Sequence, residues 1–488
     1  MLTLETLLFD NTFARLPELF YRRVEPTPLP APYLVSFNEA VAKSIGLDPR
    51  EAARTEFAEY FCGNKLFTGS EPLSAVYAGH QFGTYVPQLG DGRAILLGEA
   101  ADANGGRLDV QLKGAGLTPF SRMGDGRAVL RSTIREYLCS EAMHALGIPT
   151  TRALCIVGSD EPVFRETVES AAVLTRLAPT HVRFGTFEIF YHRGQTERVR
   201  ELADYVIRYH YAHLTNAEDK YLQFLREVIN RTARLIAQWQ AVGFAHGVMN
   251  TDNMSVIGLT IDYGPFGFLD EFDAGFICNH SDYGGRYAFD QQPNVALWNL
   301  SCFAQTLLSL IERDAAIAAL DEYQSIFADA YAARMRDKLG LASEQPDDAG
   351  LVRNTLQLLQ ANAVDYTRFF RRLCDFKTMT DERSDALRDM FIDPASFDVW
   401  AKNYRARLLS EQSVDAKRSE RMKRVNPKYI LRNHIAQRAI EKAQAGNYEE
   451  TNMLLEVLQS PYDEQPEMER FAEPPPEGSL RVVVSCSS

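Results

Sequence analysis

The chain has no C-x-x-C pair, the cysteine spacing that many structural zinc sites use. Its seven cysteines are spread singly over 488 residues, and their number is odd. A zinc ribbon and the disulfide framework of a small secreted protein are therefore disfavoured. We expect most of these cysteines to lie in the core as small apolar side chains, as is usual in intracellular proteins.

Long apolar runs are also missing. No stretch approaches the roughly 20 apolar residues that cross a bilayer, and the chain does not open with the basic start and apolar segment of a secretory leader. Its first residues are amphipathic, but Glu5, Asp10 and Glu18 argue against an import peptide, because import peptides are poor in acids. We expect a cytoplasmic protein with no membrane partner.

Positive charge is in deficit, with 52 Lys and Arg against 65 Asp and Glu and a formal net charge of −13. Sequence-independent nucleic-acid binding needs basic residues that neutralise phosphates, so we expect no nucleic-acid partner. A phosphate site must then be a local positive pocket. The motif G-x-x-x-x-G-K-[ST] is absent, which excludes a P-loop NTPase.

What is present is the composition of a folded globular chain, 45% hydrophobic and 24% charged. Residues 1–70 combine short helical patterns with a proline-rich stretch and are treated as an extension. Residues 71–175 alternate glycine turns with apolar stretches such as 94–99 and 108–113, and contain one helix over 130–146. Residues 176–445 are mainly helical apart from the Asp-, Asn- and Gly-rich segment 246–293, and residues 446–488 form an acidic, proline-rich tail.

Two local patterns in the helical part predict boundaries. The capping box at 215–218, Thr-Asn-Ala-Glu, predicts the start of a long helix that ends at Gly243. Residues 255–261 are typical of a short hairpin. The whole pattern predicts an α+β fold in which a strand-rich lobe precedes a mainly helical one.

Lys113 ends an alternating strand, the position of the lysine in the V-A-I-K strand of protein kinases. Glu136 lies on the helix that follows and could pair with that lysine, as the corresponding residues do in kinases. Each residue also has a simpler interpretation. Lysines at strand ends are usually solvated, and Glu136 could close a capping box that begins at Thr133.

The segment 246–253 is the most informative. Asn253 lies seven positions after His246, the spacing from His to the metal-binding Asn in H-R-D-x-x-x-x-N. Val248 replaces the expected catalytic aspartate, but Asp252 could serve as the base. Asp262 begins Asp-Tyr-Gly in the place of D-F-G, whose aspartate holds magnesium, although a lone Asp-x-Gly is more often a turn. The order of these elements predicts a protein-kinase-like, two-lobed enzyme that binds ATP and a divalent metal.

Two identical Gly-Asp-Gly-Arg motifs, at 90–93 and 124–127, could cradle phosphates or could be only hairpin turns. Arg176 and Arg183 could donate to phosphates in pairs of hydrogen bonds. They could equally be surface or linker arginines. The sequence around them leaves these alternatives open.

Longer motifs make the chain resemble the selenoprotein O family, also called YdiU, over nearly its whole length. These motifs are Tyr-Ala-Gly-His-Gln-Phe-Gly at 77–83, Gln-Leu-Gly-Asp-Gly-Arg at 88–93, the run 111–127, and the segments 246–253, 262–268, 426–429 and 486–488. The resemblance implies a kinase-fold protein adenylyltransferase that binds ATP in a flipped orientation. AMP would then pass to Ser, Thr or Tyr hydroxyls of protein substrates.

The same resemblance implies roles for individual residues. Asp252 is the expected proton acceptor, and Asn253 and Asp262 are expected to hold Mg²⁺, with Mn²⁺ as a substitute. The nucleotide contacts that it implies are Gly90, Gly92, Arg93, Lys113, Asp125, Gly126, Arg176, Arg183 and Asp262. We expect a monomer.

Two other functions stay open at this point. One is an ordinary kinase-type phosphotransferase, which Val248 in place of the catalytic aspartate makes less favourable. The other is a non-catalytic, ATP-binding pseudokinase scaffold. Retention of Lys113, Asn253 and Asp262 argues against it, because a scaffold does not need a complete metal and phosphate set.

Eukaryotic members of the resembled family carry selenocysteine where this chain has Cys486. We hypothesise that Cys486 pairs reversibly with Cys278, which follows Asp262 by sixteen positions. Such a bond would tie the tail across the site and couple activity to redox state. The alternative is a free tail thiol and a buried cysteine.

Overall fold

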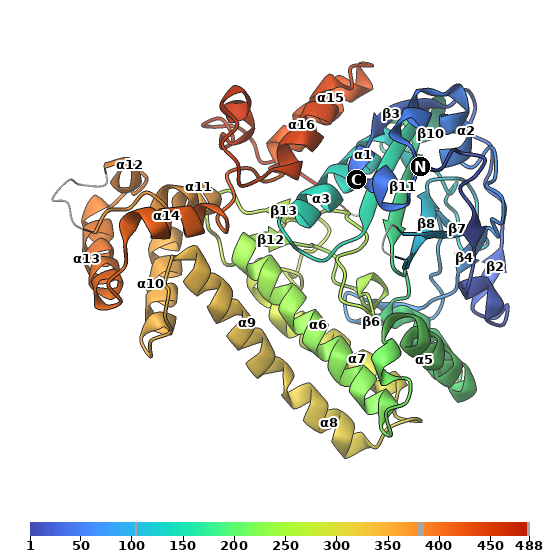
Figure 1. Cartoon of the computed structure of the whole chain (residues 1–488), viewed down its shortest axis with the longest axis horizontal. Coiled ribbons are helices and arrows are strands. Elements are labelled where there is room, and N and C mark those ends of the chain that lie inside the picture. The colour runs from blue at the N-terminus through green and yellow to red at the C-terminus, as the bar shows by residue number, and fades with distance from the viewer. Residues whose placement is uncertain (103–104, 379–384, 486–488) are drawn as a thin grey trace.

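The computed structural model describes residues 1–102, 105–378 and 385–485. They form a mixed α/β fold in which a large antiparallel sheet lies beside a helical half (Figure 1). Within the described ranges, no helix is both long enough and apolar enough to span a membrane.

The sheet has nine strands in the described part of the chain, and all its pairings are antiparallel. Its path runs through β2 (Tyr21–Arg23), β4 (Leu73–Ala75), β7 (Ala94–Ala101), β8 (Arg107–Lys113), β11 (Val168–Ala178), β10 (Arg152–Phe164) and β3 (Tyr33–Phe37). In addition, β1 (Phe9–Asp10) pairs with β7, and β9 (Ala128–Val129) pairs with β11. Residues 1–70 thus contribute three strands to the sheet as well as α1 (Glu39–Ser44) and α2 (Thr55–Phe61).

The predicted strands at 94–99 and 108–113 are confirmed as β7 and β8, which pair with Ala94 opposite Lys113. Alternation along β8 separates two environments. Val110 and Leu112 pack into the core that also contains residues of α1 and α2. The side chains of Gln111 and Lys113 bond instead to groups of the site described below.

The predicted helix at 130–146 is confirmed as α3 (Leu130–Ala145), which Val129 precedes as N-cap residue. Thr133 lies inside this helix, and its hydroxyl donates to the carbonyls of Val129 and Leu130. The capping-box interpretation of Glu136 is therefore wrong, because the helix has already begun when the chain reaches Thr133.

The helical half contains α4 (Phe184–His192), α5 (Thr196–His210), α6 (Lys220–Val242), α7 (Gln292–Thr306), α8 (Arg313–Asp321) and α9 (Tyr323–Lys338). Helices α6 and α9 lie side by side (Figure 1). Helix α6 ends at Gly243 as predicted, with a left-handed φ of 79°. It begins at Lys220 rather than at the capping box, because residues 212–217 close tight turns through the bonds Thr215 N–H to Ala212 O and Ala217 N–H to Leu214 O.

The hairpin expected at 255–261 is not formed. Ser255 makes an isolated bridge with Arg183, and Thr260 makes one with Thr150. Residues 256 and 257 lie in a turn that the Gly258 N–H closes on the Ser255 carbonyl, and the bridge partners on either side of it come from distant parts of the chain.

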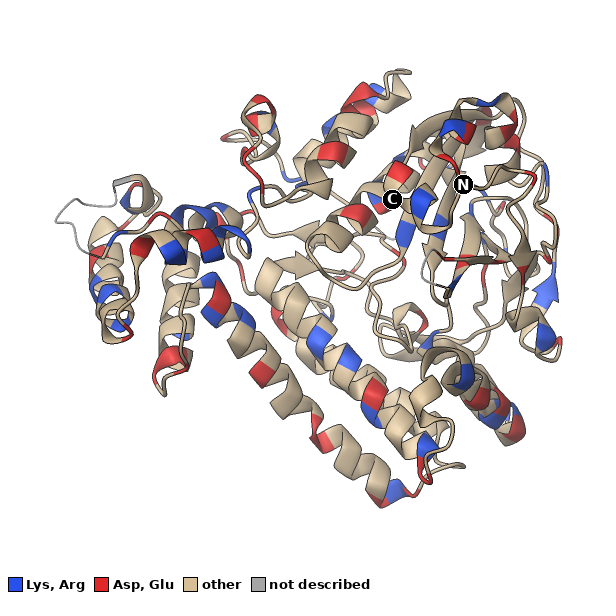
Figure 2. Cartoon of the chain, viewed as in Figure 1, with Lys and Arg blue, Asp and Glu red and all other residues tan. Residues whose placement is uncertain are grey.

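Two further groups of helices complete the fold. The first consists of α10 (Asp348–Ala361), α11 (Tyr366–Leu373), α12 (Asp385–Arg388), α13 (Pro394–Ser410) and α14 (Asp415–Lys423), and it shares an apolar core with α9 and with residues of the segment 269–289. The second, α15 (Asn433–Gln444) and α16 (Glu449–Gln459), packs against α3. The segment after residue 445 thus begins with a packed helix. Basic and acidic residues are both scattered along many of the helices (Figure 2).

Candidate nucleotide and metal site

A cavity of about 660 Å³ between the sheet and the helical half brings together residues from distant parts of the sequence. Its lining contains these residues that the sequence singles out: Gly90, Gly92, Arg93, Lys113, Asp125, Gly126, Glu136, Arg176, Asp252, Asn253 and Asp262. A larger cavity, of about 940 Å³, lies beside α5 and α6 and contains none of them. Chemistry rather than size therefore identifies the site.

Lys113 and Glu136 form the ion pair that the sequence predicts. The Lys113 Nζ donates to Glu136 Oε2 at 2.5 Å and to Asp262 Oδ1 at 3.0 Å. Arg176 donates to Glu136 Oε1 at 2.8 Å and to Asp262 Oδ1 at 2.6 Å. Arg183 donates to Asp262 Oδ2 at 2.5 Å. One carboxylate, that of Asp262, is thus shared by three cations.

These arginines are not surface residues. Arg176 and Arg183 are each only 2% exposed, and the Arg183 guanidinium stacks over the Tyr77 ring at 4.8 Å. Burial raises the pKa of the Asp262 carboxyl, but Arg176, Arg183 and Lys113 outweigh burial and hold that pKa well below its usual range. The site therefore concentrates positive charge in the interior of an acidic protein, as a phosphate site requires.

Asp262 also has an unusual backbone. Its φ is 57°, in the left-handed region that residues other than glycine rarely adopt. Such a conformation is retained only where the surroundings stabilise it, and here the three cations do so. Asp262 is thus the hub of the ion-pair network, and residues 262 and 263 are irregular, with a bend at Gly264.

Asp252 lies on the facing wall, in a short 3-10 turn (Thr251–Asn253), and is 7% exposed. Its Oδ2 accepts from Gln81 Nε2 at 3.3 Å, while its Oδ1 is buried without a hydrogen-bond partner among the described residues. Burial raises the pKa of Asp252 to about 7, although Arg183 and Gln81 act to lower it. A buried carboxylate oxygen without a partner is suited to accept a proton or to contact a cation.

The approach of Asp252 to the neighbouring hairpin requires glycine. Strands β5 (Gly79–Gln81) and β6 (Thr84–Val86) form this hairpin. A Cβ at Gly79 would lie 2.7 Å from Asp252 Oδ1, which is too close for any side chain. The motif Tyr77–Gly83 therefore supplies Gln81 and the close approach of Gly79, roles that the sequence analysis did not assign.

Asn253 donates its side-chain amide to the Val248 carbonyl at 3.0 Å, which leaves its side-chain oxygen available to a cation. Together with the carboxylates of Asp252 and Asp262, this gives a set of hard oxygen donors on the cavity wall. Mg²⁺ prefers such oxygen ligands. The residues present therefore fit the expected metal.

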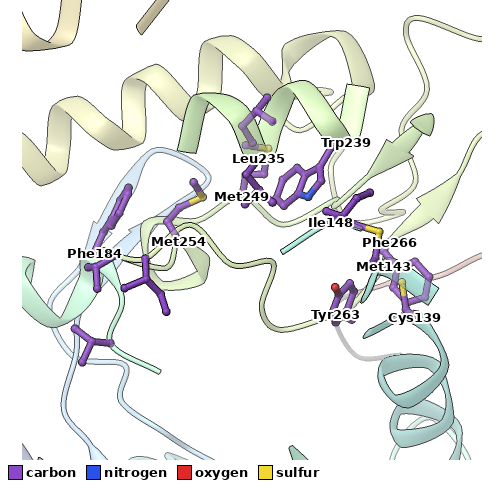
Figure 3. Close-up of a cluster of buried hydrophobic side chains, with 14 of the residues drawn as sticks. Cys139, Met143, Ile148, Phe184, Leu235, Trp239, Met249, Met254, Tyr263 and Phe266 are labelled. Carbon is purple, nitrogen blue, oxygen red and sulfur yellow. The ribbon is translucent and has the colours of Figure 1, made fainter. Parts of the chain in front are cut away.

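The loop that carries Asp252 and Asn253 is anchored in the core on both sides. Met249 and Met254, which flank it, are buried in the same apolar cluster; Figure 3 shows Met249 beside Trp239 and Met254 on the side of Phe184. His246 stacks on Trp239, and its Nε2 lies 2.9 Å from the carbonyl of Ile261, next to Asp262. The histidine thus ties the two loops of the site together.

The two Gly-Asp-Gly-Arg motifs both lie at the cavity, but their aspartates, Asp91 and Asp125, bind different partners. Asp91 is buried and accepts from the Ala75 backbone N–H and from Gln111, so it holds the sheet edge. Asp125 is held by Arg165, whose guanidinium donates to both carboxylate oxygens, at 2.8 and 2.9 Å. Gly126 has a left-handed φ of 71°, and a Cβ there would lie 2.0 Å from the Gly116 carbonyl oxygen.

Cys278 does not line the cavity. Its thiol is buried, donates to the Ala245 carbonyl at 3.5 Å, and has its pKa raised to about 12 by burial. Cys486 lies outside the described residues. Val484 nevertheless pairs with Asn279, and the His280 N–H donates to the Val484 carbonyl at 2.9 Å. Val484 therefore docks on the segment that contains Cys278, while the pairing of the two cysteines stays a prediction.

The chain is similar to known proteins over its whole length. Residues 3–459 match the sequence profile of the family described as "Protein adenylyltransferase SelO". The chain is 58% identical over 488 residues to a protein nucleotidyltransferase YdiU of Myxococcus xanthus, covering all of both chains. It is 57% identical over 489 residues to the protein of that name from Thiobacillus denitrificans, again covering both completely.

Proposed function

Because the chain belongs to the family of protein adenylyltransferase SelO, we propose that it transfers AMP from ATP to Ser, Thr or Tyr hydroxyl groups of protein substrates. The observation that carries the proposal is the shared carboxylate of Asp262, bound by Lys113, Arg176 and Arg183. Asp262, Lys113 and Arg176 line the cavity together with Asp252, and Arg183 does not line it. This is a site for a polyphosphate, a divalent cation and a hydroxyl nucleophile.

The proposal includes a kinase-like division of labour between two lobes. Residues 71–175 form a nucleotide-binding lobe with 1–70 as its extension, residues 176–445 form the lobe of the base and metal ligands, and 446–488 form the tail. The Lys113–Glu136 ion pair between β8 and α3 supports this arrangement, because a lysine on a strand paired with a glutamate on a helix positions phosphates in kinases.

The cationic groups bind and orient the nucleotide. Lys113, Arg176 and Arg183 would exchange part of their contact with Asp262 for phosphate oxygens, which accept charge-assisted hydrogen bonds of the same kind. Gly90, Gly92 and Gly126 allow the backbone to approach the phosphates closely, and Arg93 and Asp125 line the same cavity.

Asn253 and Asp262 would hold Mg²⁺, or Mn²⁺ in its place. When bound, such an ion neutralises charge that builds up on the phosphates. Asp252 would accept the proton of the substrate hydroxyl through its unpartnered Oδ1. The hydroxyl oxygen forms a bond to the α-phosphorus, the bond from that phosphorus to the bridging oxygen breaks, and diphosphate leaves.

The experiment that tests the function compares ATP labelled at the α-phosphate with ATP labelled at the γ-phosphate. Each is incubated with Mg²⁺ and a protein extract from cells that lack this enzyme, and acid-stable label on protein is measured. We expect label from the α-phosphate only. Label from the γ-phosphate only would instead identify a kinase, and no label from either would identify a non-catalytic scaffold.

A regulatory role for the tail is part of the proposal. The docking of Val484 on Asn279 supports a reversible bond between Cys486 and Cys278. Because burial raises the pKa of the Cys278 thiol to about 12, the tail cysteine is the one expected to react first. We further propose that the protein acts as a monomer.

A further inference from the structure

Three side chains with metal-binding atoms meet outside the cavity described above. They are His80 from β5, Glu188 from α4 and Cys302 from α7, and their ligand atoms all lie within 4.8 Å of one another. None of the three lines the nucleotide cavity. Their positions in the sequence are too far apart to form a recognisable motif, so only the fold brings them together.

Glu188 is the centre of this group and is fully buried, with 0% exposure. Its Oε1 lies 3.1 Å from His80 Nδ1, and its Oε2 accepts from the Thr251 hydroxyl at 2.8 Å. No lysine or arginine of the described ranges forms an ion pair with it, and His80 is its one ionic partner there. A buried carboxylate needs a compensating positive charge, and no lysine or arginine of the described ranges supplies one to Glu188.

We propose that His80, Glu188 and Cys302 bind a transition-metal ion of the zinc class, with water as the fourth ligand. The donor set of one imidazole nitrogen, one carboxylate oxygen and one thiolate sulfur suits zinc. It does not suit Mg²⁺, which prefers oxygen ligands. The inference rests on these contacts and not on the proposed function.

The geometry requires only a small movement. A tetrahedral zinc ion, with bonds of about 2.0 Å to nitrogen or oxygen and about 2.3 Å to sulfur, places its ligand atoms roughly 3.3–3.6 Å apart. His80 and Glu188 are already near this spacing. Because all three ligand atoms lie within 4.8 Å of one another, the Cys302 sulfur needs to approach by no more than about 1.5 Å. On binding, the thiol proton leaves to solvent and no electron is transferred.

Access and orientation favour the same conclusion. The His80 side chain is 15% exposed, so an ion and its water can reach it. Its ring is held edge-on against Trp298 at a centroid distance of 5.2 Å and packs against Tyr85 at 5.3 Å. Metal-binding histidines are usually held in one orientation by such neighbours.

The ion would position the loop that carries the proposed base. Thr251 directly precedes Asp252, and its hydroxyl accepts from the His80 backbone N–H at 2.7 Å while donating to Glu188. A metal on His80 and Glu188 would therefore fix both partners of Thr251. The site acts on the loop by positioning and does not touch the nucleotide cavity.

The test uses the full chain, stripped with a chelator and kept in excess Mg²⁺, and titrates Co²⁺ as a spectroscopic probe. We expect one equivalent to give the near-ultraviolet band of a cobalt–thiolate bond and the visible bands of a tetrahedral site, and Zn²⁺ to remove both. Cys302→Ser should lose the thiolate band and weaken Zn²⁺ binding by more than the roughly 10- to 100-fold that loss of an outer partner costs.

Two controls separate the outcomes. Cys62→Ser alters another buried cysteine and should leave the titration unchanged, and Asp262→Asn should keep the cobalt bands while it changes the nucleotide site. Glu188→Gln is the second ligand variant, and folding of each variant is checked by circular dichroism. Absence of a thiolate band in the parent protein, or its persistence in folded Cys302→Ser, would overturn the assignment.

Discussion

Asp262→Asn removes one negative charge from the point where three buried cations meet, with almost no change in side-chain volume. Lys113 and Arg176 keep Glu136 as an acidic partner after this change. Arg183 does not, because Asp262 is its one carboxylate partner in the described part of the chain. The substitution therefore leaves a guanidinium buried without a counter-charge.

The contacts of Arg183 set the expected loss of unfolding free energy. Removing one partner of a buried ion pair costs about 3–5 kcal/mol. Arg183 keeps hydrogen bonds to the Asp252 and His181 carbonyls and its contact with the Tyr77 ring, so we expect the lower end, about 3 kcal/mol. Loss of a metal ligand should also lower AMP transfer by at least about 100-fold, equivalent to about 3 kcal/mol of activation free energy.

The assay combines urea unfolding of the ligand-free protein with AMP transfer and with ATP binding in a chelator. Metal-free ATP should bind Asp262→Asn at least as tightly as the parent protein, because the cations have lost a competing anion. Asp348→Asn is the matched control, since Asp348 is buried and accepts from Arg407 at 2.6 Å far from the cavity. It should lose stability but keep activity.

The reasoning would be refuted by an Asp262→Asn protein that unfolds at the parent urea concentration. It would equally be refuted by retained AMP transfer. A fall in metal-free ATP affinity parallel to the loss of stability would show that the carboxylate supports the fold without opposing the phosphates. The Asp348→Asn control shows whether lost stability alone is enough to lower the activity.

Three further predictions follow from other groups. Asp252→Asn should lower the rate of AMP transfer by about 10²–10⁴, the usual contribution of a general base, with ATP affinity unchanged; retained turnover would remove it from the mechanism. Burial lowers the pKa of Lys338 from 10.5 to about 7, so the parent unfolding free energy should rise between pH 7 and 10.5 as the unfolded chain loses its extra proton. Below pH 7, the unfolding free energy of Lys338→Met should exceed that of the parent by up to about 5 kcal/mol, reduced by the loss of the cation–π contact between Lys338 and Phe370. This difference should vanish near pH 10.5, and a difference that does not change with pH in urea unfolding would contradict the assignment. Oxidised glutathione should accept two electrons from Cys278 and Cys486 and leave them joined, with a linked peptide in non-reducing mass spectrometry; its absence would exclude the pair.

The convergence of Lys113, Glu136, Asn253 and Asp262 could be predicted because each lies in a local pattern whose order matches that of kinases. The burial of Arg176 and Arg183 could not. Guanidinium groups are usually exposed, and these two are buried only because Asp262, 86 and 79 residues further along the chain, provides a shared carboxylate.

Short-range sequence pattern does not reveal which distant segments of the chain will pair with one another. Residues 255–261 contain a turn, as a hairpin would, but their bridges are to Arg183 and Thr150 rather than to one another. Strands β1 and β2 are two and three residues long, too short for a period-2 pattern, and both pair with segments at least 50 residues away. His80, Glu188 and Cys302 carry no spacing signature for the same reason.

At the position of the kinase aspartate, Val248 contributes its backbone and not its side chain to the loop. The structure employs the carbonyl of Val248, which accepts from Asn253, and any side chain at 248 leaves this bond intact. The carboxylate is supplied instead by Asp252, which is held by close backbone approach: a Cβ at Gly79 would meet its carboxylate, and one at Gly185 would lie 3.3 Å from its Cα. The backbone at these two glycines therefore packs directly against Asp252 and limits where its side chain can lie. The loss at 248 therefore relocates the proposed base rather than removing it, which favours an enzyme over a scaffold.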